Sequence, residues 1–500
     1  MGFCDKRRAG VLMHISSLPS PYGTGVFGKT AVDFAQFLAD CGFSFWQILP
    51  MTPVDAGNSP YASESAFAGY PAFIDPEMLL SDGLITREEE ASCRYDGSPY
   101  TADYAFSLEK RMAVLRAAFE RFTPDDDLEA FVSENGWVKP YSLYKALKSH
   151  YNGVEWWKWD EFSSFSTACS HYADFEKEAS FYIFVQYIFD RQWKRTKEQI
   201  NALGIDMLGD IPMYVSLDSA DVWSNTELFD IDPKTMRPNK CAGVPPDYFS
   251  ADGQFWGNPL YRWDVMKKDG YGWWMDRLAR SLSLTDALRI DHFRGFASYW
   301  AIPASAKTAK EGSWMTGPGI DFFKKVFERF GDADIIAEDL GVFGEDVVEL
   351  LDKTGFPGIR VVQFGFDPSD DSSHLPHNYP ENSVACVGTH DNNTLLGWLW
   401  EADEQNRAFA LSYCSFRGED WGEGGSRSPS CRSIIETVWR SSSAAAVIPF
   451  QDMCGFGADA RMNVPGVPTM NWRFRTTNDT VNGVDREYFR KLNQTFRRTK

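Results

Sequence analysis

Eight short apolar segments, separated by sequence with helical periodicity, constrain the fold of this chain more than any other feature. The segments span about 8–18, 43–49, 207–216, 286–290, 334–341, 359–366, 384–389 and 445–450. Helical patterns lie between most of them, such as Ala31 to Cys41, 319–330 and 344–352. Alternating strands and helices are typical of a parallel sheet. Eight such units predict a (β/α)8 TIM barrel.

Two long stretches interrupt this alternation. Residues from about 76 to 205 are charged and rich in helical patterns, with a long amphipathic helix predicted at 181–201. Residues from about 218 to 275 are rich in proline, glycine and aromatic side chains. A long loop with so many aromatics is more typical of a functional loop than of disorder. We therefore expect residues 1–500 to form a single barrel, with a helical insertion and a loop-rich lid around its mouth.

Composition excludes several classes of partner. The chain has 70 acidic and 50 basic residues and a formal net charge of -20. Such a charge repels nucleic acids and anionic membranes, so we expect a neutral or cationic partner. Aromatic residues make up 15% of the chain and suit flat ligands such as sugar rings. The nine cysteines are scattered without a C-x-x-C pair, which is typical of a reducing compartment. With neither a signal-peptide core nor a transmembrane-length run, the sequence predicts a cytoplasmic protein.

The loop Gly23 to Gly28 matches the dinucleotide-binding pattern G-x-G-x-x-G. A true fingerprint turns directly off its strand and has an acidic residue at the end of the next strand. Here Pro19 to Tyr22 intervene, and the second strand ends in Leu49 and Pro50. We therefore favour a loop that needs positive φ and expect no cofactor.

Acidic residues follow the predicted strands. They are Asp210, Asp291, Glu338, Asp339, Asp391 and Asp452, with Arg289, His292 and His390 among them. In TIM barrels the carboxyl ends of the strands form the active site, although any one of these groups, Asp452 in particular, could simply cap a helix. Arg289 and Asp291 share a face of their strand and can pair, which keeps Asp291 ionised. Asp291 could then be a nucleophile or a structural partner of the arginine.

Three chemistries use carboxylates in such positions. A metal site at His390 and Asp391 would lack a second histidine at ligand spacing, so we expect no metal. Phosphate chemistry would need a suitable glycine-rich loop. Glycoside chemistry needs a nucleophilic carboxylate and a proton donor, about 5 to 5.5 Å apart if configuration is retained. Asp291 and either Glu338 or Asp339 lie on neighbouring predicted strands, so glycoside chemistry is the interpretation we favour.

Longer motifs extend almost from end to end. They are S-P-Y-A-S-E-S-A-F-A-G at 59–69, L-G-D-I-P-M-Y-V at 208–215, D-S-A-D-V-W at 218–223, G-V-P-P-D-Y-F-S at 243–250, G-Q-F-W-G-N-P-L-Y at 253–261, then R-I-D-H-F-R-G, I-I-A-E-D-L-G, G-T-H-D-N-N-T, R-M-N-V-P-G and N-W-R-F-R. Together they resemble the 4-alpha-glucanotransferases of glycoside hydrolase family 77, called amylomaltases or disproportionating enzymes. The G-V-P-P-D loop separates this family from ordinary alpha-amylases.

The resemblance implies a role for each matching residue. Asp291 would be the nucleophile, Glu338 rather than Asp339 the acid/base, and Asp391 the stabiliser of the transition state. Other residues would contact the glucan: Tyr61 would stack on a sugar ring, and Asp210, Asp367 and Asn463 would bind its hydroxyls. Arg289, His292 and His390 would orient the three carboxyl groups and the bound sugar. A covering loop would contribute Phe249, Ser250, Gln254, Trp256 and Asn258. The family usually has Asn at Tyr70, often Tyr near Cys386 and usually Asp at Asn393; none of these departures touches the three carboxylates.

The implied activity is retaining, double-displacement transfer of an alpha-1,4-glucan segment. The donor would be a maltooligosaccharide, and the acceptor the 4-hydroxyl of glucose, maltose or another glucan. Two alternatives are an alpha-amylase-like hydrolase and a glucan-binding protein without catalysis. The intact acidic triad speaks against the second. A lid that excludes water while an acceptor sugar is bound favours transfer over hydrolysis.

Overall fold

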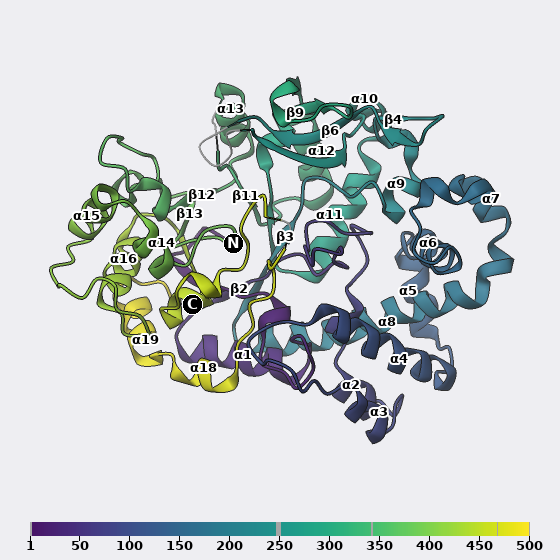
Figure 1. Cartoon of the computed structure of the whole chain (residues 1–500), viewed down its shortest axis with the longest axis horizontal. Coiled ribbons are helices and arrows are strands. Elements are labelled where there is room, and N and C mark those ends of the chain that lie inside the picture. The colour runs from purple at the N-terminus through teal and green to yellow at the C-terminus, as the bar shows by residue number, and fades with distance from the viewer. Residues whose placement is uncertain (1–2, 247–251, 342–343, 468, 500) are drawn as a thin grey trace.

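A computed structural model describes residues 3–246, 252–341, 344–467 and 469–499 (Figure 1). Eight parallel strands close into a barrel, each pairing with the next along the chain. They are β1 (Arg8–Leu12), β2 (Phe45–Gln47), β3 (Asp206–Ile211), β8 (Ala287–Ile290), β11 (Ile335–Ala337), β12 (Gly358–Val361), β13 (Ser383–Cys386) and β14 (Ala445–Pro449). Strand β14 closes the ring on β1, from Arg8↔Ala445 to Leu12↔Pro449. The predicted (β/α)8 barrel is confirmed.

Several strands are shorter than their apolar segments. The first segment leaves β1 at Leu12 and forms a 3-10 turn at Ile15–Ser17. The sixth leaves β12 at Val361 and turns at Val362–Gly365. Both turns are largely buried, and apolar side chains such as Ile15 and Val362 pack in the core although their backbone has left the sheet. Apolar sequence alone does not separate these two situations.

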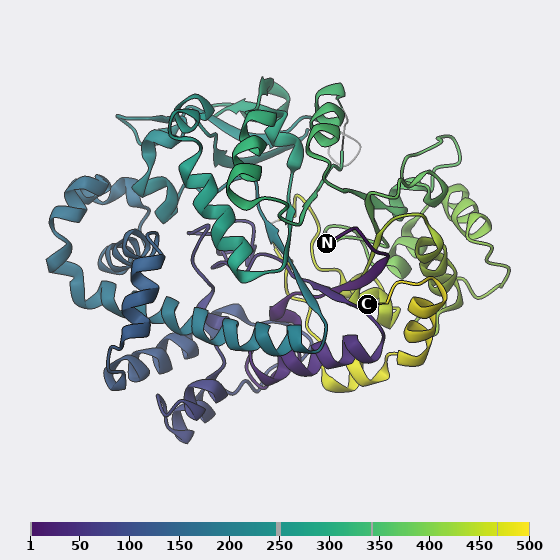
Figure 2. The same ribbon diagram turned by 180° about the vertical axis from the view of Figure 1, so that it is seen from behind.

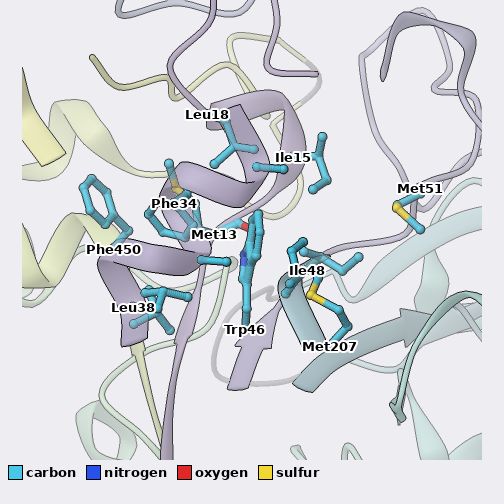
Figure 3. Close-up of a cluster of buried hydrophobic side chains, with 14 of the residues drawn as sticks. Met13, Ile15, Leu18, Phe34, Leu38, Trp46, Ile48, Met51, Met207 and Phe450 are labelled. Carbon is cyan, nitrogen blue, oxygen red and sulfur yellow. The ribbon is translucent and has the colours of Figure 1, made fainter. Parts of the chain in front are cut away.

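Helices surround the barrel and bury the outer faces of its strands. They include α1 (Lys29–Asp40), α8 (Tyr172–Ala202), α11 (Gly272–Leu284), α12 (Ile320–Phe330), α13 (Glu345–Thr354), α16 (Pro429–Arg440) and α19 (Arg486–Thr495). The indole of Trp46 points outward from β2 and donates a hydrogen bond to the carbonyl of Met13 at 2.7 Å. Its ring lies between side chains from α1 and from the strands (Figure 3). Because both faces of the sheet are buried, most residues of its strands are apolar.

Between β2 and β3 the chain forms a series of helices. They are α2 (Pro76–Ser81), α3 (Arg87–Ser92), α4 (Tyr104–Arg121), α5 (Asp126–Glu134), α6 (Val138–His150), α7 (Phe165–Ser170) and α8. Most of them project to one side of the barrel (Figure 1). The last, α8, is 31 residues long, packs against α6 and also runs beside α1 (Figure 2). One helix therefore belongs both to the insertion and to the barrel wall.

Residues 218–275 are more regular than the loop-rich pattern suggested. They form α9 (Ala220–Ser224), a small hairpin of β4 (Ile231–Asp232) and β5 (Arg237–Pro238), then β6 (Lys240–Val244), β7 (Gln254–Pro259) and α10 (Trp263–Met266). Strands β6 and β7 join β9 (Ser298–Pro303) and β10 (Ser313–Thr316) in an antiparallel sheet of order β10-β9-β6-β7. Half of this sheet comes from outside the segment, so local periodicity could not reveal it.

The G-x-G-x-x-G loop folds into the protein core. Of its glycines only Gly28 has a positive φ, 68°, directly before α1. Gly25 is needed for space, since a Cβ there would lie 1.9 Å from the carbonyl oxygen of Ile15. The expected positive φ therefore holds for one glycine of the three. All nine cysteines are free. Within the described ranges no helix is long and apolar enough to cross a membrane.

Candidate active site

The register of three neighbouring strands places two acidic residues side by side. Ile290 on β8 is the partner of Ala337 on β11, so Asp291 and Glu338 come next on each strand. The backbone N–H of Glu338 donates to the carbonyl of Ile290 at 3.0 Å, and that of Asp291 donates to the carbonyl of Ile211 at 3.0 Å. Both residues thus leave the sheet at its carboxyl edge, where TIM barrels form their active sites.

A buried arginine connects the first of these carboxylates to β3. The Nη1 of Arg289 donates to both oxygens of Asp210, at 2.8 and 2.7 Å, and its Nη2 donates to Oδ1 of Asp291 at 2.9 Å. Burial alone would lower the pKa of Arg289, but the two carboxylates raise it well above its usual range. The Asp291 side chain is 28% exposed and beside a fixed positive charge. The pairing expected from strand alternation is therefore present.

Glu338 has a different environment. Its oxygens accept backbone N–H groups of His292 at 2.7 Å and of Leu340 at 2.9 Å. Burial raises the pKa of Glu338 to about 7, and the charge of Asp291 adds to the rise while Arg289 opposes it. A carboxyl group with such a pKa exchanges its proton near neutral pH, as a general acid/base must. Two adjacent carboxyl groups with different environments are typical of glycoside chemistry.

The neighbouring Asp339 is turned away from this network. Its oxygens accept the backbone N–H of Ile359 at 2.6 Å and the Nη1 of Arg360 at 2.8 Å, and the residue is 1% exposed. It therefore joins β11 to β12 inside the protein wall. The sequence pattern alone did not separate Glu338 from Asp339, whereas their side-chain partners do.

His292 follows Asp291 in a left-handed backbone conformation, with φ 51°. This turn directs its N–H toward Glu338. Burial lowers the pKa of His292 to about 4, so the ring is neutral at neutral pH. Its Nε2 is buried and unpartnered among the described residues, and the ring meets the edge of Trp256 at 5.0 Å. This imidazole can therefore orient a polar ligand group without carrying charge.

Asp391 lies across the barrel after β13 and is the most exposed of the three carboxylates, at 46% of its side chain. Its Oδ1 accepts Nδ2 of Asn463 at 2.6 Å, and its Oδ2 lies 3.4 Å from Nε2 of His390. Asn463 also donates its backbone N–H to the carbonyl of His390 at 3.1 Å. Arg461 donates to the carbonyl of Asp391 at 2.5 Å. The carboxylate is thus fixed by these neighbours on one side and accessible to solvent on the other.

Tyr61 connects the two sides of the mouth. Its hydroxyl donates to Oδ2 of Asp210 at 2.7 Å. Its ring is stacked on that of His390, with centroids 5.0 Å apart and planes inclined by 19°. The resemblance implied stacking on a sugar, and in this structure the ring already has an aromatic neighbour in His390. The structure therefore brings together Tyr61, Asp210, Arg289, Asp291, His292, Glu338, His390, Asp391 and Asn463.

The covering strand β7 reaches the same mouth. Trp256, whose Nε1 donates to Oε1 of Gln254 at 3.0 Å, contacts His292. Asn258 donates instead to the carbonyl of Val215 at 2.9 Å and so attaches β7 to the loop after β3. Phe249 and Ser250, which were predicted to cover the glucan, lie outside the described residues.

Two other acidic residues, one expected from the resemblance and one from its place after a strand, lie apart from these groups. Asp367 is exposed, and its Oδ1 accepts the N–H and hydroxyl of Ser369 at 2.8 and 2.6 Å in a local turn. The structure does not join it to the residues above. Asp452 accepts the first N–H of α14 (Leu395–Glu401) at 2.7 Å, although the N-cap residue of that helix is Thr394. Among the described residues, no group of three or more His, Cys, Asp or Glu is arranged to hold a metal ion.

Sequence reasoning missed two residues beside the site. Arg461 holds the backbone of Asp391, and the ring of Trp472 lies against those of both Tyr61 and His390, at 5.6 and 5.7 Å. The motifs R-M-N-V-P-G and N-W-R-F-R, which contain them, were the available signal. Among the positions that depart from the family, Tyr70 and Cys386 are buried in the core, and Asn393 donates to Glu401 at 2.8 Å.

A barrel whose neighbouring strands end in an arginine-paired carboxyl group and a buried carboxyl group with a raised pKa defines the class of enzymes that cleave or transfer glycosidic bonds. Comparison with known proteins narrows the class. Residues 13–480 match the 4-alpha-glucanotransferase family. The chain is 42% identical to the 4-alpha-glucanotransferase of Thermus thermophilus, with 94% of each chain covered. It is 38% identical to the chloroplastic/amyloplastic enzyme of Arabidopsis thaliana, with 95% of this chain and 82% of that one covered.

A solved structure agrees with these sequence comparisons. The amylomaltase of Streptococcus agalactiae, determined in complex with acarbose, superposes with a TM-score of 0.93 at 36% identity, covering 99% of this chain and 100% of that one. The chain therefore belongs to the 4-alpha-glucanotransferase family, glycoside hydrolase family 77. This confirms the resemblance carried by the sequence motifs and the 4-alpha-glucanotransferase activity expected from it.

Proposed function

We propose that the chain transfers an alpha-1,4-glucan segment from a maltooligosaccharide to the 4-hydroxyl of glucose, maltose or a longer glucan, with retention of configuration. The observation that carries this proposal is the pairing of Asp291, held by Arg289, with the buried Glu338 at the ends of neighbouring strands. Strand register supports the short carboxyl separation, about 5 Å, that retaining enzymes need.

In the first step Asp291 attacks the anomeric carbon of the donor. Arg289 engages its Oδ1, so the other oxygen forms the new ester bond to the sugar. The glycosidic C1–O4 bond breaks, and Glu338 gives its proton to the departing O4. Burial of Glu338 keeps that proton available near neutral pH. The leaving glucan departs as a neutral alcohol.

In the second step the roles reverse. Glu338, now ionised, accepts the proton of an acceptor 4-hydroxyl, and the acceptor oxygen attacks the anomeric carbon while the ester bond to Asp291 breaks. Asp391, exposed above and fixed by Asn463, is positioned to hold sugar hydroxyls more tightly as positive charge develops on the ring. His292, His390, Asp210 and Tyr61 would orient the sugar and these carboxylates.

Transfer rather than hydrolysis depends on keeping water from the ester. We assign this role to β7, because Trp256 packs against His292 beside the nucleophile and Asn258 fastens the strand to the loop after β3. An acceptor sugar under this cover would replace water near the ester. The strongly acidic chain, with a net charge of -20, fits neutral glucans better than nucleic acids or membranes, and a cytoplasmic location is part of the same proposal.

Incubation with maltotriose tests the reaction. Transfer should produce glucose together with maltooligosaccharides longer than maltotriose, separated by chromatography. A hydrolase would accumulate only glucose and maltose, and a glucan-binding protein without catalysis would leave maltotriose unchanged. Either result would contradict the proposal.

A trapping experiment tests the two carboxylates separately. Alpha-maltosyl fluoride needs no protonation of its leaving group, so Glu338→Gln should still form the ester but lack the base that removes it. Mass spectrometry should find a maltosyl group on the peptide containing Asp291. The matched Asp291→Asn/Glu338→Gln variant should carry none. An adduct on a different carboxylate would overturn the assignment of the nucleophile.

A further inference from the structure

Trp472 combines an unfavourable backbone conformation with a central position beside the site. Its φ is 65°, in the left-handed region that bulky residues rarely adopt. The residue is 6% exposed, so the conformation does not arise from a free surface loop. Strained backbone of this kind persists only where surrounding contacts impose it, and it occurs preferentially at functional sites.

Its indole lies against the two aromatic rings that connect the halves of the mouth. The centroid distances are 5.6 Å to Tyr61 and 5.7 Å to His390, with planes inclined by 40° and 38°. Tyr61 and His390 are themselves stacked. The three rings thus form one cluster, and offset aromatic contacts at such distances are attractive. Through Tyr61 the cluster reaches Asp210, and through His390 it reaches Asp391.

The backbone of Trp472 is held at both of its polar groups. Its N–H donates to the carbonyl of Met462 at 2.7 Å, and its carbonyl accepts the hydroxyl of Tyr104 at 2.8 Å. The next residue pairs with the segment of the helical insertion just before α4, since the N–H of Ala102 donates to the carbonyl of Arg473 at 2.8 Å. Tyr104 is the first residue of α4. The helical insertion therefore helps to impose the left-handed turn that directs the indole toward the site.

We propose that Trp472 is a positioning residue of the transferase: its indole fixes the Tyr61–His390 pair and thereby the orientation of Asp391 and Asp210 toward the sugar. The inference rests on the proposed roles of His390 and Asp391 in the reaction. A residue that only filled space in the core would not need the left-handed backbone. Small misplacements of catalytic groups change rates by about 100-fold, so an indirect contact of this kind has measurable consequences.

The first test compares Trp472→Leu with Trp472→Phe. Leu fills space without an aromatic face and should lower kcat and kcat/KM for maltotriose together, by about 10- to 100-fold, whereas Phe should recover most of the activity. Met470→Ala is the matched control, because Met470 has the same backbone region, φ 67°, but is 76% exposed. Its kinetics should resemble the wild type. A Leu variant with a lower melting temperature but unchanged kcat per folded molecule would overturn the proposal.

A double-mutant cycle shows whether Trp472 acts through His390. In a His390→Ala background, Trp472→Leu should add less than about a twofold further loss, because the group it positions is gone. Full additivity of the two losses would overturn the inference while leaving the role of His390 intact. A His390→Ala variant as active as the wild type would instead contradict the proposed role of His390, and this inference with it.

The hydrogen bond that fixes the backbone of Trp472 can be tested without changing its indole. Tyr104→Phe removes the hydroxyl that binds the carbonyl of Trp472 and should lower kcat severalfold. Ser16→Ala is its control, since the Tyr104 hydroxyl also lies 3.0 Å from Oγ of Ser16 and this variant removes only that contact. Equal kinetics for the two variants would contradict the role assigned to the helical insertion.

Discussion

At the scale of single residues, the site contains two neighbouring carboxyl groups in contrasting environments. Asp291 is partly exposed and paired with Arg289 at 2.9 Å. Glu338 is buried and receives two backbone N–H groups, but burial dominates and raises its pKa to about 7. The two environments come from one strand register. The proposed nucleophile and proton donor therefore differ in burial and pairing, although both are carboxylic acids.

The raised pKa of Glu338 predicts the alkaline side of the pH profile. The protonated form is needed to break the donor bond, so kcat/KM for maltotriose should fall about tenfold per pH unit above about 7, where this proton is lost. Initial rates across the pH range measure it. Alpha-maltosyl fluoride is the control, because its fluoride leaves without a proton and its kcat/KM should lack this decline. A maltotriose profile that stays flat above neutral pH would contradict the assignment of Glu338.

At the scale of elements, the loop carrying His390 and Asp391 is fixed by the helix that follows it. Helix α14 begins at Leu395, whose N–H donates to the buried Asp452 in the short helix α17 (Phe450–Cys454) that follows β14. Burial raises the pKa of Asp452 to about 7, and the hydrogen bond from Leu395 opposes part of the rise. The hydrogen bond from Leu395 therefore fixes the start of α14, and its acceptor is a carboxyl group whose ionised form is disfavoured by burial.

The free energy of unfolding of the variant Asp452→Asn tests this effect of burial. The folded pKa is above the unfolded one, so the contribution of the protonated carboxyl is full below pH about 4 and is lost as pH rises through 7. Relative to wild type, the Asn variant should be similar near pH 4 and more stable near pH 8 by about 1–3 kcal/mol, because Asn keeps the acceptor and cannot ionise. Denaturant unfolding at both pH values measures the difference.

Asp403→Asn provides the comparison for that experiment. Asp403 is an exposed cap that accepts two N–H groups at the start of α15 (Glu404–Tyr413). A charged cap at a helix N-terminus is favourable, so this variant should lose stability near pH 8. If Asp452→Asn behaved in the same way, the argument from burial would be wrong.

At the scale of the whole molecule, the barrel closes where the first and last strands meet. Arg498, close to the end of the chain, is fully buried there and donates hydrogen bonds to carbonyls of Arg8, Trp439, Ser441, Ser443 and Ala444. These carbonyls lie at the starts of β1 and β14, in the last turn of α16 and in the segment that follows it. One side chain thus joins both ends of the chain at the seam of the barrel.

Arg498→Ala should therefore destabilise the protein strongly for a residue so near a terminus. Unpaired buried carbonyls and a lost charged donor predict a loss of about 2–4 kcal/mol in the free energy of unfolding, measured by thermal or denaturant unfolding. Specific activity of the folded fraction should be unchanged, because the seam lies at the opposite end of the strands from the site. Arg497→Ala, at an exposed neighbour, should change stability little. Equal losses for the two variants would contradict this account of the seam.

Much of this architecture follows from local sequence. Alternation along one strand placed Arg289 and Asp291 on the same face, and the structure pairs them. The succession of apolar and helical segments was sufficient for the barrel, because strand and helix periods are local properties. The motifs were sufficient for the family. Strand ends were overestimated, since core packing keeps sequence apolar after the backbone leaves the sheet.

Only the tertiary structure decided how the site residues are held. Glu338 and Asp339 are adjacent in sequence, yet one faces the mouth and the other the wall, because their partners come from different strands. Tyr61 and His390 are 329 residues apart and still share a hydrogen-bonding distance of 3.5 Å and a stacked contact. Burial and long-range contact set pKa values and orientations, and neither is encoded in spacing along the chain. The sequence by itself therefore determined the barrel, the family and the acidic residues at the strand ends, whereas folding determined which carboxyl group is buried, which one is paired with an arginine, and which aromatic rings pack against His390.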